Sequence, residues 1–239
     1  MQLIPAIDLL GGKAVRLHKG SYDDVTVYDD DPVGVALRFQ ASGAERVHLV
    51  DLEGARAGRA VHVEIIERIV KDAELEVQVG GGIRDRDTAL RWLDAGAAGV
   101  VMGTAALENP EMVARLAEEW PKGVIVAVDA RGGRIATQGW LKETDVALDT
   151  LAQDADAWGA AALLYTDIER DGTGVGPNVA ATARLQSTVR ARVIASGGIG
   201  TLQHLRDLKG AGVRAAVCGR ALYGGAIDLA EAFKACAEP

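Results

Sequence analysis

The feature that most restricts how this chain can fold is a repeat of its own sequence at one fixed offset. The block VHLVDLEGARAG, which begins at Val47, returns as LLYTDIERDGTG at Leu163, 116 residues later. The same offset of 116 residues relates VGGGIR to ASGGIG and AGAAGVVMG to AGVRAAVCG. Because three blocks share one unbroken offset, the sequence predicts two equivalent halves, at about residues 1–120 and 121–239.

Short apolar runs alternate with longer segments in which apolar residues recur every three or four positions. Continuous apolar runs are typical of parallel strands buried on both faces, and the longer period is typical of helices that cover a sheet. The predicted strands span residues 3–8, 46–52, 75–79, 98–103, 123–129, 162–168, 192–198 and 215–220. The predicted helices span residues 32–42, 62–72, 86–96, 109–120, 144–159, 178–189, 201–212 and 228–237.

Eight strand–helix units in 239 residues predict an α/β protein with the (β/α)8 TIM-barrel fold, built from two repeated (β/α)4 halves. A doubly wound sheet is the alternative, but it more often uses about five or six strands. Since no linker rich in Pro, Gly or Ser interrupts the pattern, we expect one barrel domain over residues 1–239.

Composition and charge exclude several classes of function. The formal net charge of −8 argues against a nucleic-acid-binding protein, which needs a basic face for the phosphate backbone. No apolar run approaches the ~18 residues of a membrane span, and the start MQLIPAIDLL lacks the basic leader of a signal peptide. We therefore expect a cytoplasmic protein with no membrane or nucleic-acid partner. Cys218 and Cys236 have neither metal-ligand spacing nor a disulfide framework, so we expect reduced thiols and no metal site.

Glycines recur at the ends of the third, fourth, seventh and eighth predicted strands. In this fold the loops at the C-terminal ends of the strands build the active site, and backbone N–H groups at such glycines can converge on a phosphate. The repeat therefore predicts two phosphate cradles on opposite rims and a substrate with a phosphate at each end, unless the glycines only make tight turns. The first cradle comprises Gly81, Gly82, Gly103 and Thr104, and the second comprises Gly197, Gly198 and Gly219.

Aspartates end four of the predicted strands, and two of them should face each other. Asp8 ends the first strand and Asp129 the fifth, and strands four apart in an eight-stranded ring lie on opposite sides of its mouth. One carboxylate of such a pair can remove a C–H proton while the other protonates a departing oxygen. Asp51 and Asp167 also end strands, and position alone does not rank the four, because each could instead cap a helix or accept a structural hydrogen bond.

A set of motifs along the whole chain resembles one enzyme family. The motifs are LIPAIDLLGGKAVRLHKG, HLVDLEGA, QVGGGIR, VMGTAALENP, DARGGRIATQGW, YTDIERDGTGVGPN, ASGGI and CGRALY. Together they resemble the phosphoribosylformimino imidazole-carboxamide ribotide isomerases of histidine biosynthesis, from the first strand to Tyr223. The resemblance implies a half-barrel repeat, no cofactor, and an Amadori rearrangement of an aminoaldose phosphate to an aminoketose phosphate. The family's substrate carries a phosphate at each end, as the repeated glycines suggest independently.

The resemblance also implies roles for individual residues. The family's proton acceptor falls on Asp8 and its proton donor on Asp129. Thr166 and Asp171 approach the reacting sugar in the family, and Asp171 is a rival for the donor role. Trp140, on the loop after the fifth strand, is expected to stack on the imidazole ring or close the site, with loop packing as the alternative. The implied phosphate- or substrate-binding residues also include Gly20, Gly176 and Arg220, the last where relatives often carry Lys.

The remaining polar candidates carry weaker signals. His18 follows a strand-like segment and is interpreted as an exposed loop residue, whereas His48 alternates with buried positions and is interpreted as a satisfied core histidine. The acidic run at residues 29–31 is expected to cap the first helix. Arg84 has Gly200 as its repeat partner, so it is open whether Arg84 touches phosphate or braces an acid at the mouth. The other histidines fall on predicted helix starts or faces: His62 and His204.

Three other functions are open at this point. The cyclase of the same pathway shares the repeat and both aspartates, but it resembles CLDV at the first strand, whereas this chain reads AIDL. A dual-substrate isomerase that also acts on phosphoribosylanthranilate is the second alternative, although GSYDDV and TQGW resemble the single-substrate form. A non-catalytic phosphosugar-binding module is the third. We expect the single-substrate isomerase, acting as a monomer on a small-molecule bis-phosphate.

Overall fold

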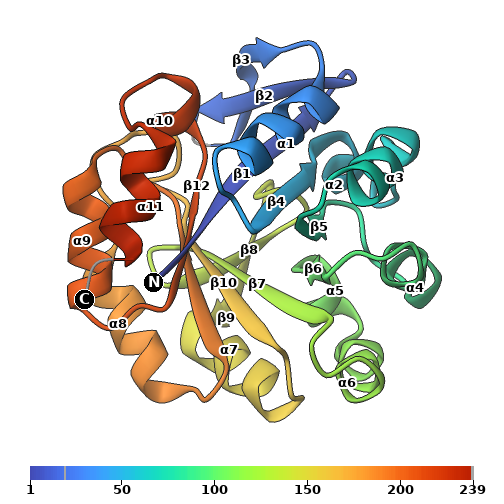
Figure 1. Ribbon diagram of the computed structural model, residues 1–239. Coiled ribbons are helices and arrows are strands. Elements are labelled where there is room, and N and C mark those ends of the chain that lie inside the picture. The colour runs from blue at the N-terminus through green and yellow to red at the C-terminus, as the bar shows by residue number, and fades with distance from the viewer. Residues whose placement is uncertain (19, 238–239) are drawn as a thin grey trace.

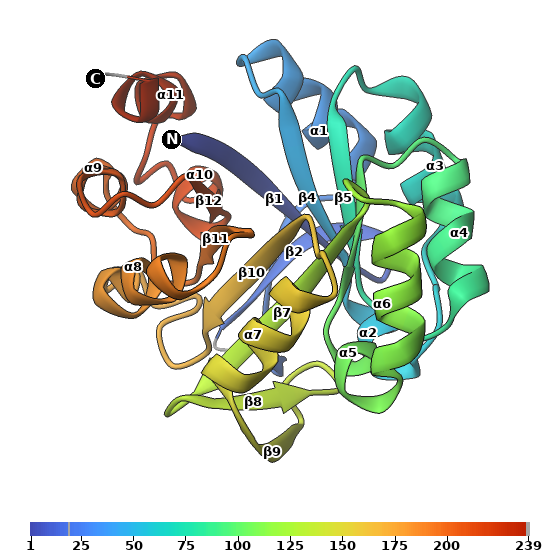
Figure 2. The same ribbon diagram turned by 90° about the horizontal axis from the view of Figure 1, so that it is seen from below.

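A closed ring of parallel strands forms the centre of the computed structural model, which describes residues 1–18 and 20–237 (Figures 1 and 2). Each strand is hydrogen-bonded to the next, and the last pairs with the first, so the ring has no open edge. In order around the ring the strands are β1 (Gln2–Leu10), β4 (Arg46–Asp51), β5 (Glu76–Gly80), β6 (Gly99–Met102), β7 (Val124–Arg131), β10 (Ala162–Asp167), β11 (Arg192–Ser196) and β12 (Ala215–Cys218). The predicted (β/α)8 barrel is confirmed.

A helix of nine or ten residues follows each ring strand and packs outside the ring (Figure 2). These helices are α1 (Pro32–Ala41), α3 (Val63–Asp72), α4 (Arg86–Asp94), α6 (Pro110–Glu119), α7 (Leu148–Ala157), α8 (Val179–Thr188), α9 (Leu202–Gly210) and α11 (Leu229–Ala237). The Asp31 side chain accepts a hydrogen bond from Gly34 N at 3.0 Å, so the acidic run caps the first helix as predicted. Within the described ranges, no helix is long and apolar enough to cross a membrane.

Three further helices are too short to leave a periodic pattern in the sequence. They follow ring strands directly and are α2 (Leu52–Ala57), α5 (Thr104–Glu108) and α10 (Arg220–Tyr223). The last two begin at equivalent positions of the two halves, immediately after Gly103 and Gly219. Both cradles therefore contain the start of a short helix, where backbone N–H groups have no partner within the helix.

A β-hairpin extends one ring strand in each half of the molecule. Ring strand β1 turns through Gly11 and Gly12 into β2 (Lys13–His18), and β7 turns through Gly132 and Gly133 into β8 (Arg134–Thr137). All four glycines have φ between 54° and 80°, the two-residue turn in which a glycine pair matches the twist of the strands. The outer strands of the hairpins are β3 (Ser21–Asp29) and β9 (Lys142–Ala147).

The second hairpin corrects one sequence prediction. Residues 144–147 were expected to begin a helix, but they belong to β9, where backbone pairing with β8 outweighs the weak helical pattern. Helix α7 begins at Leu148. The other long helices match their predicted segments, and each predicted strand overlaps a ring strand.

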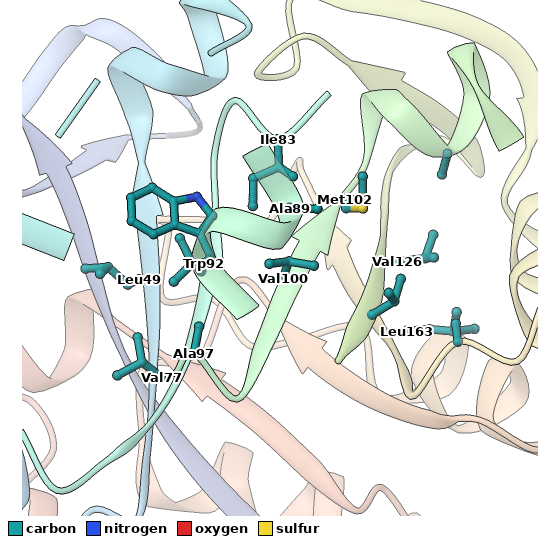
Figure 3. Close-up of a cluster of buried hydrophobic side chains, with 14 of the residues drawn as sticks. Leu49, Val77, Ile83, Ala89, Trp92, Ala97, Val100, Met102, Val126 and Leu163 are labelled. Atoms are coloured by element: carbon teal, nitrogen blue, oxygen red, sulfur yellow. The ribbon is translucent and has the colours of Figure 1, made fainter. Parts of the chain in front are cut away.

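Apolar side chains fill the space on both sides of the ring. Trp92 of α4 is fully buried against the outer face of the strands, among Leu49, Val77 and Val100 (Figure 3). Inside the ring a separate apolar cluster fills one end. Since inward positions recur every second residue, three strands show the apolar filling giving way to polar groups: Ile4, Ala6 and Asp8; Ile125, Ala127 and Asp129; Ala162, Leu164 and Thr166. The polar end is the C-terminal end of the strands.

Candidate active site

Two adjoining cavities occupy the C-terminal end of the barrel. The larger, of about 190 Å³, is lined by Asp8, Asp129, Thr166, Asp171 and Trp140, together with Gly20 and the first cradle: Gly81, Gly82, Gly103 and Thr104. The smaller, of about 20 Å³, is lined by the second cradle: Gly197, Gly198, Gly219 and Arg220. The two cavities share four lining residues: Arg16, Asp171, Ser196 and Val217. The predicted acids therefore lie between the two predicted cradles.

Asp8 is held by an arginine that the sequence reading did not single out. The turn at Gly11 and Gly12 folds β2 back along β1, and Arg16 Nη1 donates to Asp8 Oδ2 at 2.7 Å. The other terminal nitrogen of Arg16 lies 3.8 Å from an oxygen of Asp171. Burial raises the pKa of Asp8 to about 6, against the lowering effect of the guanidinium. Burial also raises the pKa of Asp171, which Arg16 again opposes.

Asp129, across the ring, has neutral partners instead of a charged one. Trp140 Nε1 donates to Asp129 Oδ2 at 2.9 Å, and the hydroxyl of Thr166, on the neighbouring strand, hydrogen-bonds to the same carboxylate. Burial raises the pKa of Asp129 to about 6, and these two hydrogen bonds oppose the rise. Both facing acids can thus exchange a proton near neutral pH, but within residues 1–18 and 20–237 a cation pairs with Asp8 and none with Asp129.

The first cradle is shaped by close backbone contacts. Gly81 and Gly82 have φ of 97° and 76°, and a Cβ on Gly82 would lie 2.6 Å from the carbonyl oxygen of Arg59. Only glycine fits both the left-handed backbone and this approach. The Thr104 hydroxyl accepts a hydrogen bond from Gln138 N at 2.9 Å, so this cradle is tied to the hairpin of the other half.

The second cradle repeats this backbone but holds more positive charge. Gly197 and Gly198 have φ of 87° and 80°. A Cβ on Gly219 would lie 2.5 Å from the guanidinium carbon of Arg16, so that arginine lies directly against this cradle. Arg220 hydrogen-bonds to the carbonyl oxygen of Gly172. Two guanidinium groups, the exposed one of Arg220 and the part-buried one of Arg16, line this cavity and suit a dianionic phosphate.

Comparisons with known proteins agree with this geometry. The family model described as histidine biosynthesis protein matches residues 2–228. The chain belongs to this histidine biosynthesis family. One relative, from Ruegeria sp. (strain TM1040), is 51% identical over 98% of this chain and 98% of its own length. Another, from Dinoroseobacter shibae, is 50% identical over 100% of both chains, and a third, from Synechocystis sp., is 49% identical over 98% of this chain and 93% of its own.

All three relatives carry the name 1-(5-phosphoribosyl)-5-((5-phosphoribosylamino)methylideneamino) imidazole-4-carboxamide isomerase, with the number 2 added for the Ruegeria protein. Membership of the histidine biosynthesis family agrees with the resemblance drawn from the motifs. The names support the isomerase interpretation and not the cyclase, the dual-substrate enzyme or the binding module.

Two glycines for which the family resemblance implies a binding role have different positions. Gly176 lies behind the second cradle, where its N–H donates to the Gly198 carbonyl oxygen at 2.8 Å. Gly20, with φ of 74°, lies under the indole of Trp140, since a Cβ there would approach a ring carbon to 2.9 Å. Trp140 itself has φ of 70°, a backbone conformation that costs a bulky residue free energy.

The other strand-end acids have structural partners. Asp51 is fully buried and accepts from the backbone N–H groups of Gly54, Val61 and His62 at 2.7 to 3.0 Å. Asp167 accepts from the side-chain amide of Asn178 at 2.8 Å. Both carboxylates are therefore occupied in holding the loops that follow their strands, which separates them from Asp8 and Asp129.

The structure shows where His48 and His18 lie and what Arg84 contacts. His48 is buried beside Gln78, with 3.1 Å between Nε2 of the glutamine and Nδ1 of the imidazole, and it also lines the large cavity. Burial lowers its pKa to about 3, so the ring is neutral. His18 is exposed as interpreted, but it is the last residue of β2 and not a loop residue. Arg84 lines the large cavity and donates to the Ala55 carbonyl oxygen at 3.2 Å, so it braces the backbone of α2 and not an acid.

Three residues that line the large cavity were not predicted from the sequence to do so: Arg16, Tyr22 and His48. The signal for Arg16 was the glycine pair in LLGGKAVR, since a two-residue hairpin returns the chain toward Asp8. Cys218 and Cys236 are buried free thiols. Among the described residues no group of three or more His, Cys, Asp or Glu side chains could hold a metal ion.

Proposed function

We propose that this chain catalyses the isomerisation for which its relatives are named, the conversion of a bis-phosphorylated aminoaldose to an aminoketose by an Amadori rearrangement. The observation that carries the proposal is the position of Asp8 and Asp129 on facing ring strands, between two glycine cradles of the same backbone geometry. A substrate with a phosphate at each end would span the site with its reacting carbons between the acids. Binding energy from both phosphates would then position the sugar.

The reaction needs one proton donor and one proton acceptor. Asp129, protonated, gives a proton to the ring oxygen of the ribose as the C1–O bond breaks and an imine forms at C1. The imine keeps its N–H and so carries a positive charge; Asp8, ionised, removes the proton from C2, the C2–H electron pair forms the C1–C2 double bond, and the C1–N π pair returns to nitrogen to give a neutral enolamine. Tautomerisation then places a proton on C1 and leaves a ketone at C2. No electrons enter or leave, so this route needs no redox cofactor.

The partners of the two acids support this division of roles. Arg16, 2.7 Å from Asp8, favours the ionised form that a base requires. Trp140 and Thr166 are neutral donors, and among the described residues no cation pairs with Asp129 to oppose its protonation. Asp171 is the competing acid: it is buried, lines both cavities and has a raised pKa. Its ionised form is favoured by Arg16, which argues for Asp129 as the donor.

The test is turnover of the named aminoaldose by the purified protein in D₂O. We expect conversion to the aminoketose, with deuterium entering at C1 if the proton taken from C2 exchanges with solvent. Asp8→Asn should lower kcat by about 10²–10⁴-fold, because the base is lost while the phosphate cradles remain. No turnover by the folded wild-type protein would refute the proposal and favour the binding-module alternative, whereas full activity of Asp8→Asn would refute Asp8 as the base.

We further propose that residues 1–239 form one domain that acts as a monomer in the cytoplasm, without a nucleic-acid partner. The closed ring, which uses strands from both halves, supports a single folding unit. Unfolding in one cooperative transition and a molar mass in solution near 25.0 kDa are the expected results. A mass of twice that value would contradict the monomer.

A further inference from the structure

His204 has contacts that tie it to the second cradle and not to the reacting centre. It lies in the first turn of α9, directly behind the cradle loop. Its Nδ1 accepts a hydrogen bond from the backbone N–H of Gly200 at 3.1 Å. A Cβ on Gly176 would lie 3.2 Å from Nε2 of the same ring, so the imidazole packs against the backbone of Gly176. One side chain therefore contacts two different loops.

The two glycines that His204 contacts support the cradle. Gly176, in the loop after β10, donates to the Gly198 carbonyl oxygen at 2.8 Å. Gly200 follows the cradle glycines in the loop after β11, and a Cβ there would lie 2.5 Å from the Gly174 carbonyl oxygen. The imidazole thus lies where the two loops meet. Its position controls how the backbone of Gly197 and Gly198 is presented to the smaller cavity.

The first half braces its cradle differently at the equivalent place. The repeat partner of Gly200 is Arg84, whose side chain donates to the Ala55 carbonyl oxygen and lies 2.7 Å from where a Cβ on Gly58 would be. Gly58 is the repeat partner of Gly174, which lies two residues before the Gly176 that His204 contacts, so the two braces act on the same loop of each half. The repeat partner of His204 is Thr88, which hydrogen-bonds only to Asp85 of its own helix cap, at 3.1 Å. Where the second half has lost the arginine, a histidine one helical turn later reaches back instead.

We propose that His204 is a positioning residue for the second phosphate cradle: by accepting the Gly200 N–H and packing on Gly176, it fixes the backbone that receives one end of the substrate. This inference rests on the proposed function. Because His204 touches neither the acids nor the reacting sugar, its loss weakens binding of a non-reacting phosphate. Such a loss raises KM and leaves kcat nearly unchanged.

The experiment compares two substitutions at position 204 with a matched control. His204→Leu removes the acceptor but keeps the bulk, whereas His204→Asn keeps an acceptor close to the place of Nδ1. Thr88→Ala, at the equivalent position of the first half, is the control. We measure KM and kcat for the bis-phosphate aminoaldose, thermal unfolding, and the hydrogen-exchange rate of the Gly200 amide.

For His204→Leu we expect KM to rise about three- to tenfold, the value of one lost hydrogen bond, with kcat within about twofold. Its Gly200 amide should exchange faster. His204→Asn and Thr88→Ala should stay within about twofold of the wild type in both constants. An unchanged KM in His204→Leu, or an Asn variant as impaired as the Leu variant, would overturn the proposal.

The two proposals fail in different ways. If the wild type does not convert the aminoaldose, the proposed function fails, while the Gly200 amide still decides whether His204 braces the cradle loop. If His204→Leu does not fold, His204→Gln takes its place, since its longer amide reaches past the Nδ1 position. Slow Gly200 exchange in that folded variant would contradict the brace.

Discussion

The two half-barrels use the same hairpin to deliver different chemistry to facing acids. In the first half, a Gly–Gly turn brings Arg16 back to Asp8; in the second, an equivalent turn leads to a loop from which Trp140 reaches Asp129. The acids occupy matching places on the ring, and burial raises both pKa values to about 6. What differs is the partner, a cation on one side and a neutral donor on the other.

This difference shows which segments keep the same length in both halves and which do not. The cradle glycines keep an offset of 116 residues, as from Gly81 to Gly197, but Asp8 and Asp129 are 121 residues apart. The first half therefore has five more residues than the second between its acid and its next ring strand, and they lie in the hairpin segment. The backbone that would hold phosphate is thus the duplicated part, and the segment that sets the protonation of the acids is the diverged part.

Among changes to the partners of the two acids, the largest expected effect comes from removing the cation. Arg16 lowers the pKa of Asp8 against the effect of burial, so without Arg16 that pKa rises further above its usual value. Since a base must be ionised, Arg16→Met should move the acidic limb of kcat/KM to higher pH and lower kcat/KM at pH 6 by about tenfold or more. Arg16→Lys, which keeps the charge, is the control. A pH profile of Arg16→Met that overlays the wild type would break the comparison.

The second prediction concerns stability. Burial raises the pKa of Asp129, so the stability of the fold changes with pH in the opposite direction from that given by a salt-bridged carboxylate. The folded-state pKa of Asp129 is about 6, above the ordinary aspartate value of 3.8, so the folded protein binds more protons than the unfolded chain between these values. Stability therefore falls as pH rises from about 4 to about 6 and stays lower above that range.

Asp129→Asn removes this ionisation. At pH 8 it should raise the free energy of unfolding by about 1–3 kcal/mol, and the gain should disappear near pH 4. Denaturant unfolding at both pH values measures the difference. If the variant is less stable than the wild type at pH 8, burial of the ionised Asp129 carboxylate does not destabilise the fold.

The smallest effect comes from the neutral partner. Trp140→Phe keeps an aromatic ring over Gly20 but removes the N–H that favours the ionised form of Asp129. The pKa of Asp129 should rise, and because an acid must be protonated, the basic limb of kcat/KM should move to higher pH. We expect kcat/KM at the optimum to fall only about three- to tenfold, as for one hydrogen bond. A shift of the acidic limb instead would mean that Trp140 acts on Asp8.

Sequence reasoning predicted the ring and the cradle positions because these depend on local patterns. Apolar runs give the strands, and glycines with an unbroken offset give the cradles. The start of α7 was wrong because pairing between β8 and β9 is non-local, and the short helix α2 has too few residues to show a period. Arg16 was missed because its importance depends on a contact across a hairpin: the glycine pair marks the turn, but the partner of Arg16 appears only when that turn folds it onto Asp8.

The claim at the centre of this account is that the two working acids are Asp8 and Asp129, which face each other from the first ring strand of each half. The most direct test is kcat of Asp129→Asn beside kcat of Asp171→Asn, at pH 6 and saturating aminoaldose, with unfolding curves to show that both variants fold. We predict that Asp129→Asn loses about 10²–10⁴-fold in kcat while Asp171→Asn loses no more than about tenfold. A nearly active Asp129→Asn together with an inactive Asp171→Asn would contradict the account, because the base and the acid would then both be residues held by Arg16.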